Sequence, residues 1–243
     1  MILKVYLIIL AYFFAGVIGF YFINRRKEKT RSRKSWKKTL VYFIIINIVA
    51  LSIVINPIAF RFIALLIIIE GFYELFKLFR GSDYKSKKLF VLSILIFALF
   101  SYAFFYFSGL SKELIFFSFA ILSIFDSFSQ ITGELWGRKK IAPKISPNKT
   151  VEGFIGGSLV ALISGILLKG LIGVPWSKSM AISAGVALFA FLGDLAASFY
   201  KRNYNVKDFS NLLPENGGIL DRFDSLVAGG AWIAFITIIT NIL

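Results

Sequence analysis

Long apolar runs alternate with short charged segments along the whole chain. Each run is about 17 to 25 residues long, which is enough for a helix to cross the ~30 Å hydrocarbon core of a bilayer. We count eight such runs, at approximately residues 2–23, 40–55, 58–79, 89–107, 114–136, 151–174, 179–200 and 219–243. Because backbone polar groups in lipid must bond within their own segment, the pattern predicts an all-α polytopic membrane helical bundle with about eight transmembrane helices.

Composition supports the membrane assignment and narrows the chemistry. Of the 243 residues, 58% are apolar and 17% are aromatic, and the mean hydropathy is +0.78, values above those that the surface of a soluble domain tolerates. The sequence has no cysteine and no histidine, which excludes disulfides, thiolate nucleophiles and metal sites built from Cys or His. Any metal must bind oxygen ligands, which favours a hard cation such as Mg²⁺ over zinc.

Lysine and arginine concentrate in alternate loops. Of the 28 such residues, nine lie within 24–38, five within 77–88, five within 138–149 and four within 201–222. By the positive-inside rule these loops are cytoplasmic, which predicts a multi-pass protein of the cell (inner) membrane with both termini outside. The net charge of +15 is then explained by topology and by attraction to anionic membrane lipids, and we expect no nucleic acid partner.

Polar residues that are unusual for a membrane span concentrate in the second half of the chain. An ionisable group in a span costs at least ~2.5 kcal/mol on insertion scales, so each one needs a partner, water or a function. We therefore predict N-terminal transmembrane helices, about four, with basic loops in 1–112, and a catalytic transmembrane half in 113–243. The polar residues concerned are Asp126, Ser129, Gln130, Glu152, Asp194, Asp221 and Asp224.

One polar stripe runs along the predicted helix at 114–136. Asp126, Gln130, Gly133 and Gly137 follow one another at helical spacing, so they lie on one face. Such a face must meet protein or water. It is typical either of a substrate-binding surface that includes Asp126 or of a packing face, because small residues bring membrane helices together.

The basic loop that follows ends at a predicted helix start. Pro147 and Asn148 favour a turn, Thr150 is a candidate N-cap, and Glu152 lies in the first turn, where the helix dipole tolerates an acid. The free amides at such a helix start favour binding of an anion, here a phosphate, and an ordinary basic loop is the alternative. The side chains that would join these amides are Lys144, Ser146, Asn148 and Lys149.

Two further segments bring carboxylates to helix ends. Asp194 and Ser198 lie one helical turn apart, and Asp221 and Asp224 are three residues apart after a Gly-Gly pair. Three carboxylates in a low dielectric repel one another unless a cation binds them or each has its own basic partner. We expect the three aspartates to share a divalent cation. The basic residues available for individual pairing are Lys201, Arg202, Lys207 and Arg222.

Residues 198–224 resemble the signature of the CDP-diacylglycerol synthase family, also called phosphatidate cytidylyltransferases. That signature reads S-x-φ-K-R-x4-K-D-x-small-x2-φ-P-x-H-G-G-φ-x-D-R-φ-D, where φ is apolar, and its spacing is intact over 27 positions here. The segments ISPNKTVEGFIGG and DSFSQITGELWGRKK are similar to two further family segments, so the resemblance covers roughly residues 120–230. The matching signature residues are Ser198, Lys201, Arg202, Lys207, Asp208, Ser210, Leu213, Pro214, Gly217, Gly218, Ile219, Asp221, Arg222, Phe223 and Asp224.

The resemblance implies an enzyme of phospholipid biosynthesis, a membrane nucleotidyltransferase that converts CTP and a phosphatidate-like lipid phosphate to a CDP-lipid and pyrophosphate at the cytoplasmic side. The cofactor would be Mg²⁺, with room for a second cation, held by Asp194, Asp221 and Asp224. The catalytic residues would be these three aspartates with Lys201 and Arg202. Substrate and phosphate would be bound by Ser146, Asn148, Lys149, Ser198, Lys207, Asn216, Gly217, Gly218, Arg222 and Asp126.

Two positions depart from the family pattern. Asn216 stands where the family usually has His, and Tyr200 replaces an aliphatic residue. Asn can hydrogen-bond a phosphate or a base but carries no proton near neutral pH, so a mechanism that needs His there is excluded. A paralogue with another lipid substrate, and an inactive paralogue, therefore stay open.

Two rival functions stay open beside the cytidylyltransferase. One is a CTP-dependent polyprenol or phytol kinase, which would transfer the γ-phosphoryl group of CTP. The other is an ion transporter that uses the acidic residues as a path. A homodimer is also open, because the sequence does not decide the oligomeric state.

Overall fold

The fold is known from a computed structural model that describes residues 29–213 and 217–240, with residues 14, 17–18 and 21. Seven α-helices make up most of this part of the chain. They are α2 (Lys29–Ile55), α3 (Pro57–Gly81), α4 (Lys87–Phe107), α5 (Lys112–Trp136), α6 (Val151–Leu168), α7 (Trp176–Asn203) and α8 (Leu220–Thr240). A short antiparallel hairpin, β1 (Lys140–Ala142) with β2 (Ser146–Thr150), lies between α5 and α6, and a 3-10 turn, η1 (Lys169–Leu171), follows α6.

Five helices in the described part of the chain are long and apolar enough to cross a membrane: α4, α5, α6 with η1, α7 and α8. The predicted all-α polytopic membrane bundle is thereby confirmed. The predicted span 40–55 lies in α2, whose apolar part is shorter, and the predicted span 58–79 lies in α3, which carries charged side chains. The predicted span 2–23 falls mostly outside the described residues, so the count of eight and the orientation stay predictions.

Helix α2 begins earlier than the apolar pattern predicts. It starts at Lys29 and so includes most of the basic segment that we expected to be a loop, because Lys and Arg are themselves good helix formers. Its end is sharply defined. The Asn56 side chain accepts a hydrogen bond from the Ile58 amide at 3.0 Å, and Pro57 takes the first position of α3, an arrangement that starts a new helix.

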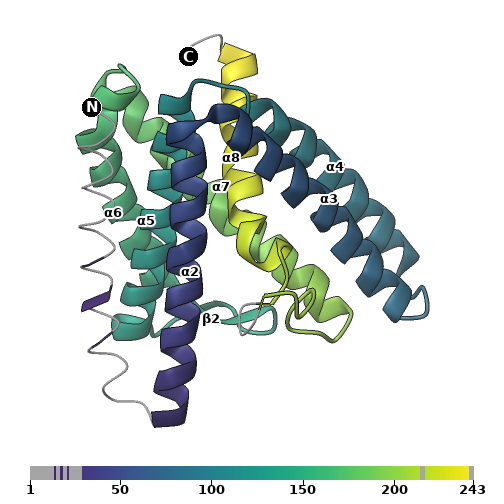
Figure 1. The fold of residues 1–243 in the computed structure, drawn as a ribbon. Coiled ribbons are helices and arrows are strands. Elements are labelled where there is room, and N and C mark those ends of the chain that lie inside the picture. The colour runs from purple at the N-terminus through teal and green to yellow at the C-terminus, as the bar shows by residue number, and fades with distance from the viewer. Residues whose placement is uncertain (1–13, 15–16, 19–20, 22–28, 214–216, 241–243) are drawn as a thin grey trace.

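The helices form a bundle around α8. The most extensive helix contacts are those of α5 with α6, α7 with α8, and α4 with α8. Figure 1 shows α3 and α4 side by side and diverging from α2, α5 and α6, with α8 between the two groups. Phe60 packs edge-on against Phe104 and Phe107 in the core. Because α8 packs on α4, the predicted N-terminal and catalytic halves are in contact, and the boundary at residue 112 stays a prediction.

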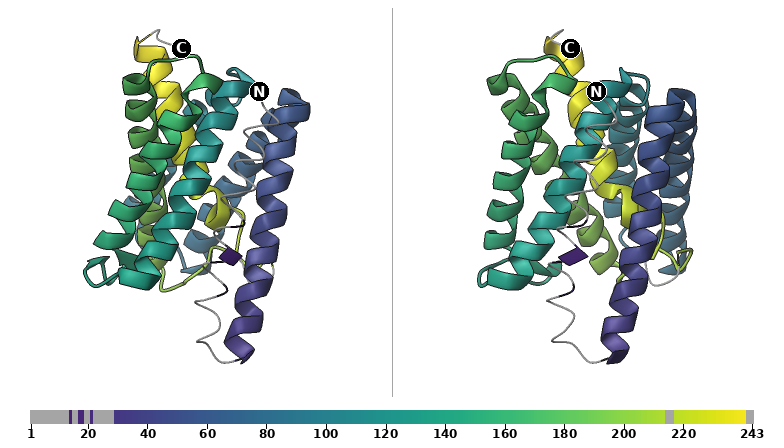
Figure 2. Two further views of the ribbon diagram at one scale, coloured as in Figure 1. Left: turned by 90° about the vertical axis from the view of Figure 1, so that its left-hand side faces the viewer. Right: turned by 60° about the vertical axis from the view of Figure 1, so that its left-hand side comes forward.

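The polar segments lie together at one end of the bundle. Figures 1 and 2 show the β1–β2 hairpin and the connection from α7 to α8 at the same end, and β2 contacts α5, α6 and α7. The fold therefore places the two segments that carry most of the predicted site residues next to each other.

Candidate functional site

The hairpin is anchored by the first turn of α6. The Thr150 hydroxyl accepts a hydrogen bond from the Gly153 amide at 3.1 Å, which confirms the predicted N-cap. The Glu152 carboxylate accepts bonds from the amides of Arg138 and Lys139 at 3.0 and 3.2 Å. Glu152, which was expected to lie favourably in the first turn of α6, thus also fixes the backbone just before the hairpin by hydrogen bonds.

Part of the polar stripe predicted on α5 is a helix packing surface. Added Cβ atoms at Gly133 and Gly137 would lie 3.1 and 2.7 Å from the Thr150 hydroxyl oxygen, so these glycines allow the hairpin and α6 to approach α5. Gln130 is exposed and donates to Glu134 at 2.9 Å. The packing interpretation therefore holds for the glycines of the stripe.

Lys149, near the end of β2, links the hairpin to α7. Its Nζ atom lies 2.6 Å from one carboxylate oxygen of Asp194 and 4.5 Å from the centroid of the Phe191 ring. The other Asp194 oxygen accepts a hydrogen bond from the Ser198 hydroxyl at 3.3 Å. The Lys149 and Asp194 side chains are 19% and 37% exposed, so a phosphate arriving from water can reach this pair.

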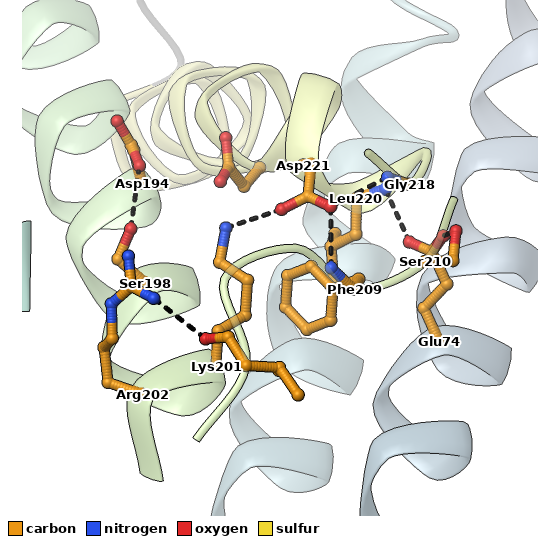
Figure 3. A network of polar contacts seen from close by, with 12 residues as sticks. Glu74, Asp194, Ser198, Lys201, Arg202, Phe209, Ser210, Gly218, Leu220 and Asp221 are labelled. Carbon is orange, nitrogen blue, oxygen red and sulfur yellow. Dashed lines mark hydrogen bonds and ion pairs between the residues drawn. The ribbon is translucent and has the colours of Figure 1, made fainter. Parts of the chain in front are cut away.

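A second ion pair lies deeper in the protein. The Lys201 Nζ atom on α7 lies 2.5 Å from one oxygen of Asp221 on α8, and the two side chains are only 10% and 2% exposed. The other Asp221 oxygen accepts hydrogen bonds from the amides of Phe209 and Gly218 at 2.7 and 2.8 Å. Figure 3 shows this network. Asp221 therefore holds together the end of α7, the connection that follows it and the start of α8.

The Gly-Gly pair before α8 serves this network. Gly217 has a φ of +81°, a left-handed conformation that other residues adopt only with strain. A Cβ at Gly217 would lie 2.6 Å from the Asp221 carboxylate, and the Gly218 amide already donates to that carboxylate. The tight backbone approach predicted for these glycines is thus made to the chain's own Asp221, and their contact with a substrate phosphate stays a prediction.

Arg202 connects the two polar segments. Its Nε atom donates to the Ile145 carbonyl in the hairpin at 3.2 Å, and its Nη1 atom donates to the Val206 carbonyl after α7 at 3.0 Å. These bonds fix the hairpin against the connection from α7 to α8. The catalytic role predicted for Arg202 stays a prediction.

Acidic side chains on two other helices feel the charge of Asp194. Asp126 on α5 and Asp224 on α8 each interact electrostatically with Asp194 on α7. Lys149 opposes the negative charge of both, and Arg222 opposes that of Asp126. The structure thus brings Asp126, predicted from the α5 stripe, into the same electrostatic environment as two of the three predicted metal ligands.

The other predicted site residues differ in how far they are exposed to solvent. Asn148 and Lys207 are exposed, and Ser146 is half-buried in the hairpin. Arg222 is half-buried on the first turn of α8. Asn216, the residue that replaces the family His, lies outside the described residues.

The carboxylates of the site differ in whether they are free to bind Mg²⁺. Mg²⁺ is usually held by one or two protein carboxylates, with water and substrate phosphates as the other ligands. Asp194 and Asp224 repel each other electrostatically, and a cation bound between them would offset that repulsion. Within residues 29–213 and 217–240 no three acidic side chains are grouped closely enough to hold one ion, and Asp221 is engaged by Lys201 and two amides. Sharing of one cation by all three aspartates stays a prediction, and it would require Lys201 to move.

Sequence reasoning missed two contacts made by α3, because it treated the first four helices as nearly featureless. The Glu74 carboxylate accepts hydrogen bonds from Ser210 and from amides at the start of α8. The hydroxyl of Tyr200, a departure from the family pattern, donates to the Leu75 carbonyl at 2.7 Å. A glutamate inside an apolar run was itself the available signal, because such a group needs a partner or a function.

The helices and the site together define a polytopic membrane protein with a polar site at one end of its bundle, where lysines and carboxylates suited to phosphate and cation binding are paired. Comparison with known proteins places it more closely. The model of the cytidylyltransferase family matches residues 109–240, more than half of the chain, and the chain belongs to this family. The resemblance seen in the sequence is confirmed, and both ion pairs lie within the matched segment.

Similar curated proteins share one name. The phosphatidate cytidylyltransferase of Bacillus subtilis (strain 168) is 43% identical over 115 residues, which are 46% of this chain and 43% of the relative. That of Staphylococcus aureus (strain COL) is 44% identical over 117 residues, which are 46% of this chain and 44% of the relative. The matched segment therefore spans less than half the length of these relatives.

Proposed function

We propose that the protein is a membrane cytidylyltransferase of phospholipid biosynthesis that converts CTP and a phosphatidate-like lipid phosphate to a CDP-lipid and pyrophosphate. The observation that carries the proposal is the pairing of Lys149 with Asp194 and of Lys201 with Asp221 at one end of the bundle. Each pair sets an ammonium group suited to a phosphate beside a carboxylate suited to a cation. Family membership and the names of the relatives support the same reaction.

The proposed reaction is an in-line displacement at the α-phosphorus of CTP. An oxygen of the lipid phosphate attacks that phosphorus and forms a new P–O bond. The bond from the α-phosphorus to the oxygen that bridges it to the β-phosphate breaks, and pyrophosphate leaves with the electron pair. The lipid phosphate is already an anionic nucleophile, so the reaction needs no strong general base, and a chain without histidine or cysteine can carry it out.

The task of the protein in this reaction is to align the reactants and to offset negative charge. Lys149 is the more accessible of the two paired lysines, and it would exchange its contact with Asp194 for an oxygen of the triphosphate. Ser198, now bound to Asp194, would donate to a phosphate in the same movement. Lys201 is more deeply buried and would keep Asp221 and the start of α8 in place.

The release of Asp194 by Lys149 would prepare a metal site. Asp194 and Asp224 would then hold Mg²⁺ from α7 and α8, with substrate phosphates completing its coordination. Bound Mg²⁺ would neutralise the triphosphate and stabilise the departing pyrophosphate. Asp126, within electrostatic reach of Asp194, is the candidate for a second cation or for a substrate contact.

The proposal places the site at the cytoplasmic face of the cell (inner) membrane. CTP is supplied from the cytoplasm, and the basic loops favour that side. The acyl chains of the lipid would stay in the bilayer beside the apolar helices. The homodimer stays a prediction, to be checked by the mass of the purified protein in detergent.

Labelled CTP tests the proposal against its rivals. The purified protein in lipid nanodiscs would be given Mg²⁺, CTP labelled at either the α- or the γ-phosphate, and both phosphatidate and a polyprenol or phytol as acceptors. We expect the α-label to enter the lipid and the γ-label to leave in pyrophosphate. Entry of the γ-label into lipid would instead show a kinase, and cation flux across liposomes without CTP, with no label in lipid, would show a transporter.

A further inference from the structure

Glu74 is a buried acid on a helix that lies outside the family-matched segment. Glu74 is only 1% exposed. One carboxylate oxygen accepts hydrogen bonds from the Ser210 hydroxyl at 2.7 Å and the Ile219 amide at 3.1 Å, and the other accepts one from the Leu220 amide at 2.8 Å. Figure 3 shows Glu74 on one side of the connection from α7 to α8 and Lys201 on the other.

The charge of Glu74 is offset by a helix end. Among the described residues its carboxylate has no ion-pair partner, and the ion pairs of this region are those of Asp194 and Asp221. The Ile219 and Leu220 amides belong to the start of α8, where unpaired N–H groups and the helix dipole favour an anion. Glu74 therefore caps α8 from a different helix.

The Gly-Gly pair fits between two carboxylates. A Cβ at Gly217 would meet Asp221, and a Cβ at Gly218 would overlap a carboxylate oxygen of Glu74. The Asp221 carboxylate accepts a hydrogen bond from the Gly218 amide, and the Glu74 carboxylate accepts hydrogen bonds from the amides of Ile219 and Leu220. The turn before α8 is thus held from both sides, and the amides of 218–220 are engaged by the protein itself.

The neighbouring residue of α3 makes a second connection to the site. The Tyr200 hydroxyl donates to the Leu75 carbonyl at 2.7 Å, and Tyr200 directly precedes Lys201. Helix α3 thus contacts the end of α7 through Leu75 and the start of α8 through Glu74. These are the two elements that must be aligned for Lys201 to reach Asp221.

We propose that Glu74 is a positioning residue for cytidylyl transfer. It fixes the turn at 217–218 and the first turn of α8, and through them the buried Asp221 carboxylate and the Asp224 carboxylate that is proposed to bind the cation. The kinetic part of this inference rests on the proposed function, whereas the fixing of the turn does not. An N-terminal helix that the family match does not cover thereby sets the geometry of the site.

The test replaces Glu74→Gln, which keeps the shape of the side chain but leaves one acceptor oxygen for three donors. Its amide group would face a backbone N–H, so the turn should loosen. We expect faster hydrogen exchange at the amides of 218–220 in nanodiscs. We also expect kcat per folded molecule to fall about tenfold and the KM for CTP to rise, the size of effect that follows when one charge-assisted hydrogen bond is lost.

Two further variants serve as controls. Glu70→Gln removes a half-buried acid one helical turn earlier on α3, which makes no hydrogen bond to the described part of the turn, and it should leave exchange and kinetics unchanged. Ser210→Ala removes one of the three donors and should produce a smaller change in the same direction. In the Glu74→Gln background the further effect of Ser210→Ala should largely vanish, because the two residues act together.

The outcomes separate positioning from mere stability. A structural role alone would lower the yield of folded protein and leave KM and kcat per folded molecule as in the wild type, and that result would overturn the proposal. If Glu74→Gln does not fold, normal exchange and kinetics in Ser210→Ala would overturn it. If the wild type forms no CDP-lipid, the proposed function fails, and the exchange of 218–220 still decides whether Glu74 fixes the turn.

Discussion

Replacing Lys201→Met should destabilise the protein, because it leaves a buried carboxylate without its cation. The Lys201 and Asp221 side chains are 10% and 2% exposed, and their charged atoms are 2.5 Å apart. Removing one partner of a buried pair costs about 3–5 kcal/mol. Two amide bonds to the other Asp221 oxygen remain, so we expect the lower end, about 3 kcal/mol. For a chain of this size that is a fall in Tm of roughly 6–12 °C.

The assay is thermal unfolding in one detergent, followed by tryptophan fluorescence. Met keeps most of the length of the Lys201 side chain and removes the ammonium group, whose nitrogen also lies 5.1 Å from the centroid of the Phe209 ring, so the loss of charge is the main change. Adding Asp221→Asn to Lys201→Met removes the unpaired charge and keeps an oxygen that can accept from the Phe209 and Gly218 amides. The double variant should therefore be more stable than the single one. A single variant as stable as the wild type, or a double variant less stable than the single one, would refute the reasoning.

Three further predictions concern the turn, the hairpin and the metal. Gly217→Ala should lower both Tm and CDP-lipid formation, because φ is +81° and the new Cβ would meet Asp221; Gly173→Ala, with a φ of +66° but open space, is the control for backbone strain alone. Glu152→Gln should raise the KM for CTP with little change in Tm, because a neutral amide oxygen is a weaker acceptor than the carboxylate oxygen that now accepts from both the Arg138 and Lys139 amides; an unchanged KM would contradict this. EDTA should stop turnover reversibly, and Asp224→Asn should raise the Mg²⁺ concentration for half-maximal activity by about tenfold or more; wild-type Mg²⁺ dependence would remove Asp224 from the metal site.

Local features of the fold could be predicted from the sequence. The lengths of the apolar runs predicted helices α4 to α8, and the Thr150 N-cap follows from residue type and position. The turn predicted at Pro147 and Asn148 is wrong: these residues lie in β2, the turn lies at 143–145, and the pairing of β1 with β2 was not predicted. Those strands are short and basic, and they lack the apolar alternation that predicts a strand.

Contacts between distant helices could not be predicted. Electrostatics required that the charge of each carboxylate be offset, and a metal ion, a lysine or the N–H groups at a helix start can do so. The choice of Lys149 for Asp194 and of Lys201 for Asp221 depends on where the hairpin and α7 lie, which the sequence alone does not fix. Glu74 was missed for the same reason, since its three donors come from a segment far along the chain.

The central claim is that this site joins the phosphate of a lipid to the α-phosphorus of CTP. The most direct measurement is mass spectrometry of the products formed from unlabelled CTP and phosphatidate whose terminal phosphate oxygens are ¹⁸O. The account predicts a CDP-lipid that retains all of the ¹⁸O, pyrophosphate that contains none, and no CDP-lipid from the Asp194→Asn protein. Label in the pyrophosphate, or full CDP-lipid formation by Asp194→Asn, would contradict it.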